Sequence, residues 1–383
     1  MIVGHTADIH LRGGEGSEEA VALMKAAGIF IEKGCKIVCI NGDIFEDVSD
    51  PDQRLVFRNF LDMLHGEGIS TFTLRGNHDK PKDLRSFKDK LNPLCYEFDK
   101  PGHIILPNSL EKIQVFALPH FGAGALALQN QSIDDFHSKG NNLIVDLLED
   151  WFQKIRNYSG PSLVLFHGTV SGAVLDNKRI PRNNGIFLPQ TILDSFGCPV
   201  VGGHYHFCQK IGQWIWYSGS TTRQTWGEAD DDKGILLWEI EDGSWRKEPD
   251  FISLNPEPMR TVNLDWDGEN LIDKESGKVL EPTEFKGKVR IRLDVPEALS
   301  HSVPKTLEKF FPKATDLKPE RSTISKVAVR SEEIGSVESI EDGIIVYFRA
   351  KNKPESEIHG LLEEYRIGYF EMTEGLKIGE GAI

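Results

Sequence analysis

Carboxylate, amide and imidazole side chains occur in five short groups within the first 206 residues. Each group stands at or just after a run of apolar residues. The groups are Asp8-x-His10, Gly42-Asp43, Gly76-Asn77-His78-Asp79, His167 and Gly203-His204-x-His206. A mixed set of oxygen and nitrogen ligands suits Mn²⁺, Fe or Zn²⁺ better than Ca²⁺, and it does not resemble a metal site built from sulfur. Each group alone is weak evidence for a metal site, but the five groups in this order predict a metal centre.

The ligands outnumber the four positions of one tetrahedral ion. Asp8 and His10 are two residues apart, as are His204 and His206, so each pair points to one side of an extended segment. Two ions about 3.5–4 Å apart, bridged by one carboxylate, would use all of the ligands and favour in-line displacement at phosphorus. We therefore expect a centre of two divalent ions that hydrolyses phosphate esters.

The surrounding apolar patterns predict the elements that position these groups. Strands are expected over residues 1–9, 36–40, 69–74, 112–118, 162–166 and 199–202, and helices over 18–33, 53–65 and 143–156. Strands that alternate with helices predict a sheet with substantial parallel pairing. Ligands collect beyond the carboxyl ends of the strands in such sheets. Because Asp8, Asp43 and His78 each follow a predicted strand, we expect them to share one site.

The pattern changes after residue 204. Residues 211–218 and 234–239 have no helix between them and are expected to form antiparallel hairpins. Residues 250–260 contain two prolines and are expected to connect two domains. Beyond them we expect strands over 288–295, 325–329 and 343–348, and helices over 304–311 and 355–365. These elements predict a small α+β module.

Composition limits the possible partners and compartment. The 383-residue chain carries a formal net charge of −15, so it lacks the basic footprint of a free-standing nucleic-acid binder. A polyanionic substrate would therefore need metal ions and a partner to supply positive charge. The N-terminus does not have the pattern of a signal peptide, and no run of about 18 apolar residues occurs, so we expect a cytoplasmic protein with no membrane span. Cys35 and Cys39 are expected to be buried thiols.

Taken together, the five groups resemble the calcineurin-like metallophosphoesterase family, whose pattern is D-x-H, G-D, G-N-H-[DE], H and G-H-x-H. The resemblance covers about residues 1–240 and implies an α/β fold of two packed mixed β-sheets flanked by helices. It implies one metal ion held by Asp8, His10, Asp43 and His206, and a second held by Asp43, Asn77, His167 and His204. Asp43 would bridge the two ions. Mn²⁺ is the favoured metal, with Mg²⁺, Fe and Zn²⁺ as alternatives.

A narrower resemblance rests on four segments. The stretches ADIHLRG, NGDIFED, RGNHD and GGHYHF…WYSGSTTRQTWGE…KGILLWEI are similar to the SbcD nuclease branch, including bacteriophage recombination nucleases. This branch implies a DNA exonuclease or endonuclease acting in recombination, repair or replication. It also implies an SMC-like ATPase partner of the SbcC type, a homodimer and a small capping domain. Glu46 and Asp47 stand where archaeal and eukaryotic relatives carry a histidine, which favours a bacterial or phage origin.

These implications define the expected domains. Residues 1–255 would form the nuclease domain, 256–350 the α+β capping domain, and 351–383 a C-terminal helix and tail available to a partner. The helix over 53–65 has a broad apolar face. That face would either pack on the sheet, which we favour, or form a dimer interface.

His78 is left over once both predicted ions have their ligands. An imidazole in that place is suited to donate a proton to the leaving oxygen, so His78 is the predicted general acid. Asn77 would both ligate a metal ion and touch the scissile phosphate. Asp79 is a candidate to orient the His78 ring, as a carboxylate fixes a histidine tautomer elsewhere.

Other residues and functions have simpler interpretations. His5 and His65 are expected to be structural or solvated, and Glu228–Asp232 to be a solvated turn. His120, at the end of a predicted strand, either lines the site or has a structural role. Trp214, Trp216 and Trp226 are expected to pack in the sheet rather than stack on bases, and Cys208 is not expected to be a ligand. A small-molecule phosphodiesterase or phosphatase is the alternative function, followed by a catalytically silent binding subunit.

Overall fold

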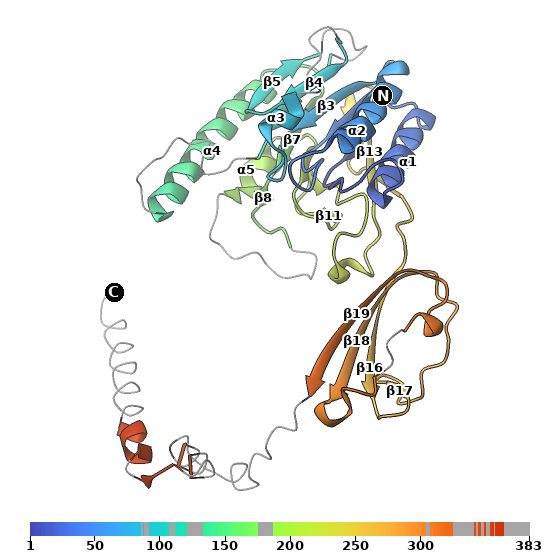
Figure 1. The fold of residues 1–383 in the computed structure, drawn as a ribbon. Helices are drawn as coiled ribbons and strands as arrows, with labels where there is room; N and C mark the ends of the chain where they lie inside the picture. The colour runs from blue at the N-terminus through green and yellow to red at the C-terminus, as the bar shows by residue number, and fades with distance from the viewer. Residues whose placement is uncertain are drawn as a thin grey trace. The chain divides into compact units, whose positions relative to one another are not determined.

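The computed structural model describes most of the chain (Figure 1). The described residues are 1–85, 87, 92–106, 112–120, 133–174, 187–303, 307–324, 341, 344–345, 348–349, 353–355 and 357–363. By contacts, the chain divides into two compact units. The first comprises Met1–Thr261, Lys286–Val289 and Ala314–Asp316, and the second comprises the remainder. The predicted domain boundaries at residues 255 and 350 stay predictions.

The first sheet carries three of the predicted ligand groups. Its strand order is β14-β13-β1-β2-β3-β4, and β15 pairs with β13. The strands are β1 (Ile2–Thr6), β2 (Ile37–Ile40), β3 (Ser70–Leu74), β4 (Cys95–Phe98), β13 (Gly234–Glu241), β14 (Ser244–Trp245) and β15 (Asp250–Ser253). Strands β1 to β4 pair in parallel, whereas β13 is antiparallel to β1. The sheet is therefore mixed, and β1, β2 and β3 end at one edge.

The second sheet carries the remaining groups. Its order is β11-β12-β10-β7-β6-β5. The strands are β5 (Gly102–Ile105), β6 (Gln114–Leu118), β7 (Ser162–His167), β10 (Val200–Gly203), β11 (Gln209–Lys210) and β12 (Ile215–Tyr217). The four central strands pair in parallel and the two outer strands are antiparallel, so this sheet is also mixed. A two-stranded sheet of β8 (Thr169–Val170) and β9 (Phe187–Leu188) follows β7 along the chain.

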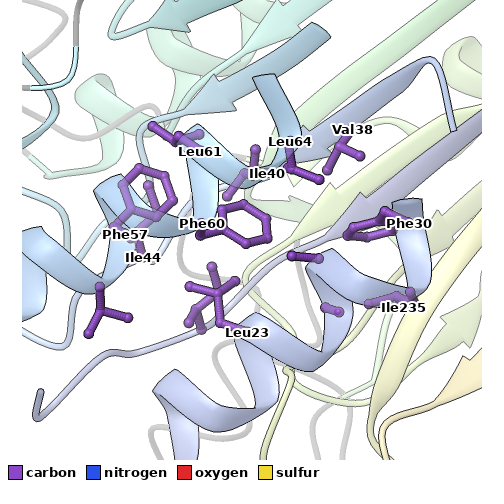
Figure 2. Close-up of a cluster of buried hydrophobic side chains, with 14 of the residues drawn as sticks. Leu23, Phe30, Val38, Ile40, Ile44, Phe57, Phe60, Leu61, Leu64 and Ile235 are labelled. Carbon is purple, nitrogen blue, oxygen red and sulfur yellow. The ribbon is translucent and has the colours of Figure 1, made fainter. Parts of the chain in front are cut away.

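Two amphipathic helices cover the outer face of the first sheet. Helix α1 (Glu18–Glu32) starts at Ser17, whose side chain accepts a hydrogen bond from the Ala20 amide. Helix α2 (Pro51–Gly66) starts with a complete capping box. Figure 2 shows their apolar side chains, such as Phe30 and Phe60, packed with strand residues such as Val38. Burying each such ring contributes about 1.5–3 kcal/mol. Since α2 residues pack with the strand residues, the favoured prediction that the 53–65 helix packs on the sheet is confirmed.

The remaining helices cover the second sheet, so the order of layers is helices, first sheet, second sheet, helices. Helices α4 (Ile133–Arg156) and α5 (Gln190–Ser195) pack on the second sheet around buried residues such as Trp151 and Leu193. Between the sheets lies a third core cluster with residues from both, including Phe72 and Leu165. The short helix α3 (Pro81–Arg85) follows β3. The predicted fold of two packed mixed sheets flanked by helices is confirmed.

The C-terminal part contains a further four-stranded sheet. Its order is β17-β16-β18-β19, from β16 (Met259–Trp266), β17 (Leu271–Asp273), β18 (Gly287–Pro296) and β19 (Ala314–Ile324). Burial alternates along β18, as expected for a sheet with one covered face. Strand β19 lies at the edge, where Pro319 can be accommodated because an edge strand has unpaired amides.

The antiparallel hairpins expected at residues 211–218 and 234–239 are confirmed as β11–β12 in the second sheet and β13–β14 in the first. Two other sequence predictions for the later chain are wrong. The helix expected over 304–311 is reduced in its described part to a 3₁₀ turn, Glu308–Phe310, and Pro312 disfavours helical backbone at Phe311. The strand expected over 343–348 is helical at 344, 345 and 348, which shows that β-branched residues alone do not fix a strand. The strand expected over 325–329 lies outside the described residues.

Candidate active site

The predicted ligands lie in turns at the carboxyl ends of parallel strands. Asp8, His10, Asp43 and His204 all adopt positive φ, at 51°, 52°, 51° and 107°. Such backbone costs side-chain-bearing residues of order 1–3 kcal/mol each and persists where the surrounding structure enforces it. Here the turns after β1 and β2 are joined by hydrogen bonds from the Asp8 amide to Gly42 and from the His10 amide to Asp43, each 3.0 Å long.

Two glycines allow the turns to approach one another. A Cβ atom on Gly76 would lie 2.1 Å from Oδ1 of Asp43, and one on Gly42 would lie 2.3 Å from Nδ1 of His167. Gly42 also has a φ of 89°, which favours glycine. The glycines of the Gly-Asp and Gly-Asn-His-Asp groups are therefore required for the backbones and ligands to pack together.

The structure brings the predicted ligands together as two sets. The ligand atoms of Asp8, His10 and His206 lie within 4.8 Å of one another, and so do those of Asp43, His167 and His204. The amide oxygen of Asn77 joins the second set, 3.0 Å from Nε2 of His167 and 2.9 Å from Nδ1 of His204.

Asp43 lies between the sets. Its Oδ2 atom is 3.9 Å from Nε2 of His10 and 3.4 Å from Nε2 of His167. One carboxylate oxygen thus faces a histidine from each set, as a bridging ligand requires. The roles assigned to these seven ligands remain predictions.

The residues present fit two divalent ions. Nε2 of His10 is buried without a hydrogen-bond partner among the described residues, whereas Nδ1 lies 2.8 Å from the Glu46 carboxylate. Burial lowers the pKa of His10 to about 4 and that of His204 to about 3, so both are neutral ligands at pH 7. The pKa of Asp8 is raised by burial to about 6, so this carboxyl is largely ionised at pH 7. Neutral imidazoles and ionised carboxylates are the forms that bind metal.

His167 is the ligand candidate that holds a proton at neutral pH. Burial lowers its pKa, but the Asp43 carboxylate beside it outweighs burial and raises the pKa to about 9. Nδ1 of His167 lies 2.6 Å from the Asn41 carbonyl oxygen. A carbonyl only accepts, so Nδ1 donates and Nε2 is the atom directed at Asp43 and Asn77.

His78 lies beside the first ligand set. Its ring is 4.9 Å from that of His10 in an edge-on arrangement. Its backbone amide donates to Oδ1 of Asp43 over 2.8 Å, which ties the predicted general acid to the bridging carboxylate. The Nδ1 atom of His78 lies 2.7 Å from the Glu46 carbonyl oxygen.

The prediction that Asp79 orients the His78 ring is wrong. The Asp79 carboxylate is buried and accepts hydrogen bonds from the amides of Ile44, Phe45 and Gly76, between 2.8 and 3.1 Å long. Asp79 therefore fastens the turn after β3 to the turn after β2. The His78 ring is oriented by the Glu46 carbonyl instead.

Glu228 is a site residue that the sequence analysis missed. It is fully buried rather than part of a solvated turn, and its Oε1 atom is 3.2 Å from Nδ1 of His206. The spacing Thr225-x-x-Glu228 matches that of a capping box. Thr225 makes no side-chain cap bond, however, and its hydroxyl instead donates to Glu228 over 3.0 Å.

The other histidines divide between site and scaffold. His120 lies beside the second set, with its ring 6.1 Å from that of His167 and 6.4 Å from that of His204. His5 is fully buried in β1, and His65 lies 2.8 Å from the Thr71 hydroxyl, which supports structural roles for both. Trp214 and Trp216 pack against the core between the sheets, as expected.

Comparison with known proteins identifies the family. The chain matches the sequence model described as calcineurin-like phosphoesterase over residues 1–208, which is more than half of its length. The chain belongs to the calcineurin-like phosphoesterase family. Membership makes it a metal-dependent phosphoesterase, a hydrolase, whose candidate centre is the two ligand sets described above. No curated protein matches the chain.

Solved structures resemble this calcineurin-like phosphoesterase at low identity. A dimetal phosphatase from Danio rerio is 13% identical with a TM-score of 0.42, and the match covers 67% of this chain and 99% of that one. The protein TT1561 of Thermus thermophilus is 10% identical with a TM-score of 0.41, and the match covers 66% and 99%.

The chemistry of the site follows from its side chains. When bound, two divalent ions would supply a nucleophile at neutral pH and neutralise charge on the phosphoryl oxygens. Oδ2 of Asp43 lies 3.9 Å from His10 of the first set and 3.4 Å from His167 of the second, and Asn77 contacts the second set. His78 lies beside the first set with Nδ1 bonded to the Glu46 carbonyl, and its doubly protonated ring could donate a proton from Nε2 to a leaving oxygen.

Proposed function

We propose that this calcineurin-like phosphoesterase is a DNA nuclease of the SbcD type. It would cleave phosphodiester bonds with two divalent ions, most readily Mn²⁺, in recombination, repair or replication. The observation that supports the hydrolytic part is the position of the Asp43 carboxylate between His10 and His167, one from each candidate ligand set. The choice of DNA is supported by the similarity of the four segments around these ligands to the SbcD branch.

Two arginines support a phosphate-backbone substrate. Arg12 lies 3.2 Å from Glu46, which itself lies 2.8 Å from His10 of the first set. Arg75 donates to the carbonyl oxygen of His120, beside the second set. Arg12 is shared by Glu46 and Glu19, so Arg75 is the stronger support for a chain of phosphates, because each neutralised phosphate adds salt-dependent affinity.

The partner and the assembly are also proposals. A net charge of −15 repels DNA away from the metal centre, so an SMC-like ATPase of the SbcC type would supply the remaining DNA contacts. We expect cleavage of duplex DNA to rise when that ATPase and ATP are added. Residues 351–383 are the proposed partner segment. A homodimer would use α2, on which Leu55 is 50% and Met63 38% exposed.

A nuclease assay tests the function. Purified protein is incubated with end-labelled linear duplex and single-stranded DNA in Mn²⁺, Mg²⁺ or Zn²⁺. We expect cleavage with Mn²⁺, loss of cleavage in Asp8→Asn through loss of a metal ion, and loss in His78→Ser with both ions retained. DNA that stays intact with every metal ion, with and without the ATPase, would contradict the proposal.

A small-molecule phosphodiesterase or phosphatase is the second candidate. The acidic composition favours it, because a small substrate needs no extended basic surface. Rates on a nitrophenyl phosphodiester and on nucleotides, measured beside the DNA assay, separate the two functions. Within the described residues, no helix is long and apolar enough to cross a membrane. The cytoplasmic location stays a prediction.

A further inference from the structure

Glu228 and Lys233 hold the metal-ligand candidate His206 from two directions. Oε1 of Glu228 accepts a hydrogen bond from Nδ1 of the His206 ring over 3.2 Å. Nζ of Lys233 donates to the His206 backbone carbonyl over 2.8 Å. The ammonium and the carboxylate form an ion pair of 2.8 Å, and both side chains are fully buried. The ring and the backbone of one ligand are thus fixed by one ion pair.

The Glu228 carboxylate has donors at both oxygens. The Thr225 hydroxyl donates to Oε1, and the Gln224 amide donates to Oε2, each over 3.0 Å. Lys233 adds the charged donor at Oε2. A glutamine side chain at position 228 would direct its NH₂ group at one of these donors. Only an ionised carboxylate can therefore accept all three hydrogen bonds.

The other ligand histidines are supported differently. His167 is held by the neutral backbone carbonyl of Asn41. His10 lies 2.8 Å from Glu46, whose side chain is 41% exposed and is shared with Arg12. Among the described residues, His206 is the ligand whose partner is a fully buried carboxylate with a buried cation of its own.

The buried carboxylate has a consequence for metal binding. Donation of the Nδ1 proton to Glu228 leaves the lone pair on Nε2 of His206 for a metal ion. A carboxylate behind a ligating histidine fixes its tautomer and raises its basicity, and removing such a partner typically weakens metal binding about 10–100-fold. His206 belongs with Asp8 and His10, so this effect concerns one of the two sets.

We propose that Glu228 and Lys233 are positioning residues that set the affinity of the metal ion held by Asp8, His10 and His206. The described contacts of Glu228 and Lys233 reach His206 of the first set and no member of the second. The two sets should therefore respond differently when the ion pair is altered. The inference concerns metal binding alone and does not depend on DNA being the substrate.

Titration of metal-free protein with Mn²⁺ tests the inference. Calorimetry measures both affinities, and electron paramagnetic resonance follows bound and paired ions. For Glu228→Gln we expect one affinity to fall roughly 10–100-fold while the other stays within about twofold. Asp8→Asn identifies the affected set, because it should weaken the same ion. Two unchanged affinities in a folded Glu228→Gln protein would overturn the inference.

Further variants separate positioning from general destabilisation. If Glu228→Gln does not fold, the double variant Glu228→Gln/Lys233→Met removes both buried charges and is titrated instead. It should fold and still bind one ion weakly, and wild-type affinity for both ions would overturn the inference. Asp194→Ala is the matched control, because Asp194 holds the amides of Gln213 and Trp214 in the same unit. The same selective loss in this control would also count against the inference.

Discussion

The Nδ1 atom of His78 lies 2.7 Å from the backbone carbonyl oxygen of Glu46. Because a carbonyl oxygen only accepts, Nδ1 of His78 carries a hydrogen, so the proton given to a leaving oxygen must come from Nε2 of the doubly protonated ring. The Glu46 side chain meanwhile lies 2.8 Å from His10 of the first ligand set. One residue therefore orients the predicted general acid through its backbone and contacts a ligand through its side chain.

Substitution of His78 tests that role. His78→Ser should bind two Mn²⁺ ions with wild-type affinity and lose about 10²–10⁴-fold in kcat, because a general acid contributes about that much. Calorimetry gives the metal stoichiometry, and steady-state assays on a nitrophenyl phosphodiester give kcat. A leaving group of low pKa needs less proton transfer, so the loss should be smaller on that substrate than on an alkyl phosphodiester. Loss of a metal ion in this variant would show that His78 is a ligand.

Gly76 is expected to tolerate no side chain. In Gly76→Ala the added Cβ would lie 2.1 Å from Oδ1 of Asp43, so the bridging carboxylate must shift. We expect at least a tenfold loss of metal affinity, measured by Mn²⁺ titration. Gly66→Ala is the control, since nothing lies within 4 Å of its added Cβ at the end of α2, and it should bind metal normally. Equal metal binding in both variants would refute the steric argument.

Asp79 is expected to contribute stability rather than catalysis. Asp79→Ala leaves the amides of Ile44, Phe45 and Gly76 without their buried acceptor. Each unsatisfied buried group costs about 1–3 kcal/mol, so unfolding free energy should fall by at least about 2 kcal/mol. Urea unfolding of the metal-free protein measures this change. A variant as stable as the wild type would mean that water replaces the carboxylate at all three amides.

Metal binding should release one proton near neutral pH. The Asp43 carboxylate outweighs burial and raises the pKa of His167 to about 9, so this imidazole is protonated at pH 7 and must lose its proton to bind an ion. Affinity for the second ion should therefore rise about tenfold per pH unit between pH 7 and 9, and then level off. His10 and His204 add no such dependence there, because burial lowers their pKa values to about 4 and about 3.

Calorimetry in buffers of different ionisation enthalpy counts the released protons. About one proton per two ions is expected at pH 7.5 and none at pH 10. In His167→Gln the release near neutral pH should disappear together with tight binding of the second ion. Proton release that stays constant from pH 7 to 10 would contradict the assignment to His167.

The sequence by itself determined the α/β fold and the set of ligand candidates. Apolar strands place Asp8, Asp43 and Asn77 at strand ends, and parallel strands deliver their ends to one edge. Such local patterns can be read along the chain. The later elements could not be predicted in this way, because strands such as β19 depend on packing within a sheet rather than on local preference.

Only the tertiary structure decided which groups support the ligands. Glu228 is 22 residues from His206 along the chain, and Asn41 is 126 residues from His167, yet each orients its histidine. Asp79 is adjacent to His78 in sequence but binds backbone amides of the turn after β2. A short hydrogen bond depends on the path of both backbones. Residue type and spacing therefore identified the ligand candidates, whereas the partners that orient them emerged only from the folded chain.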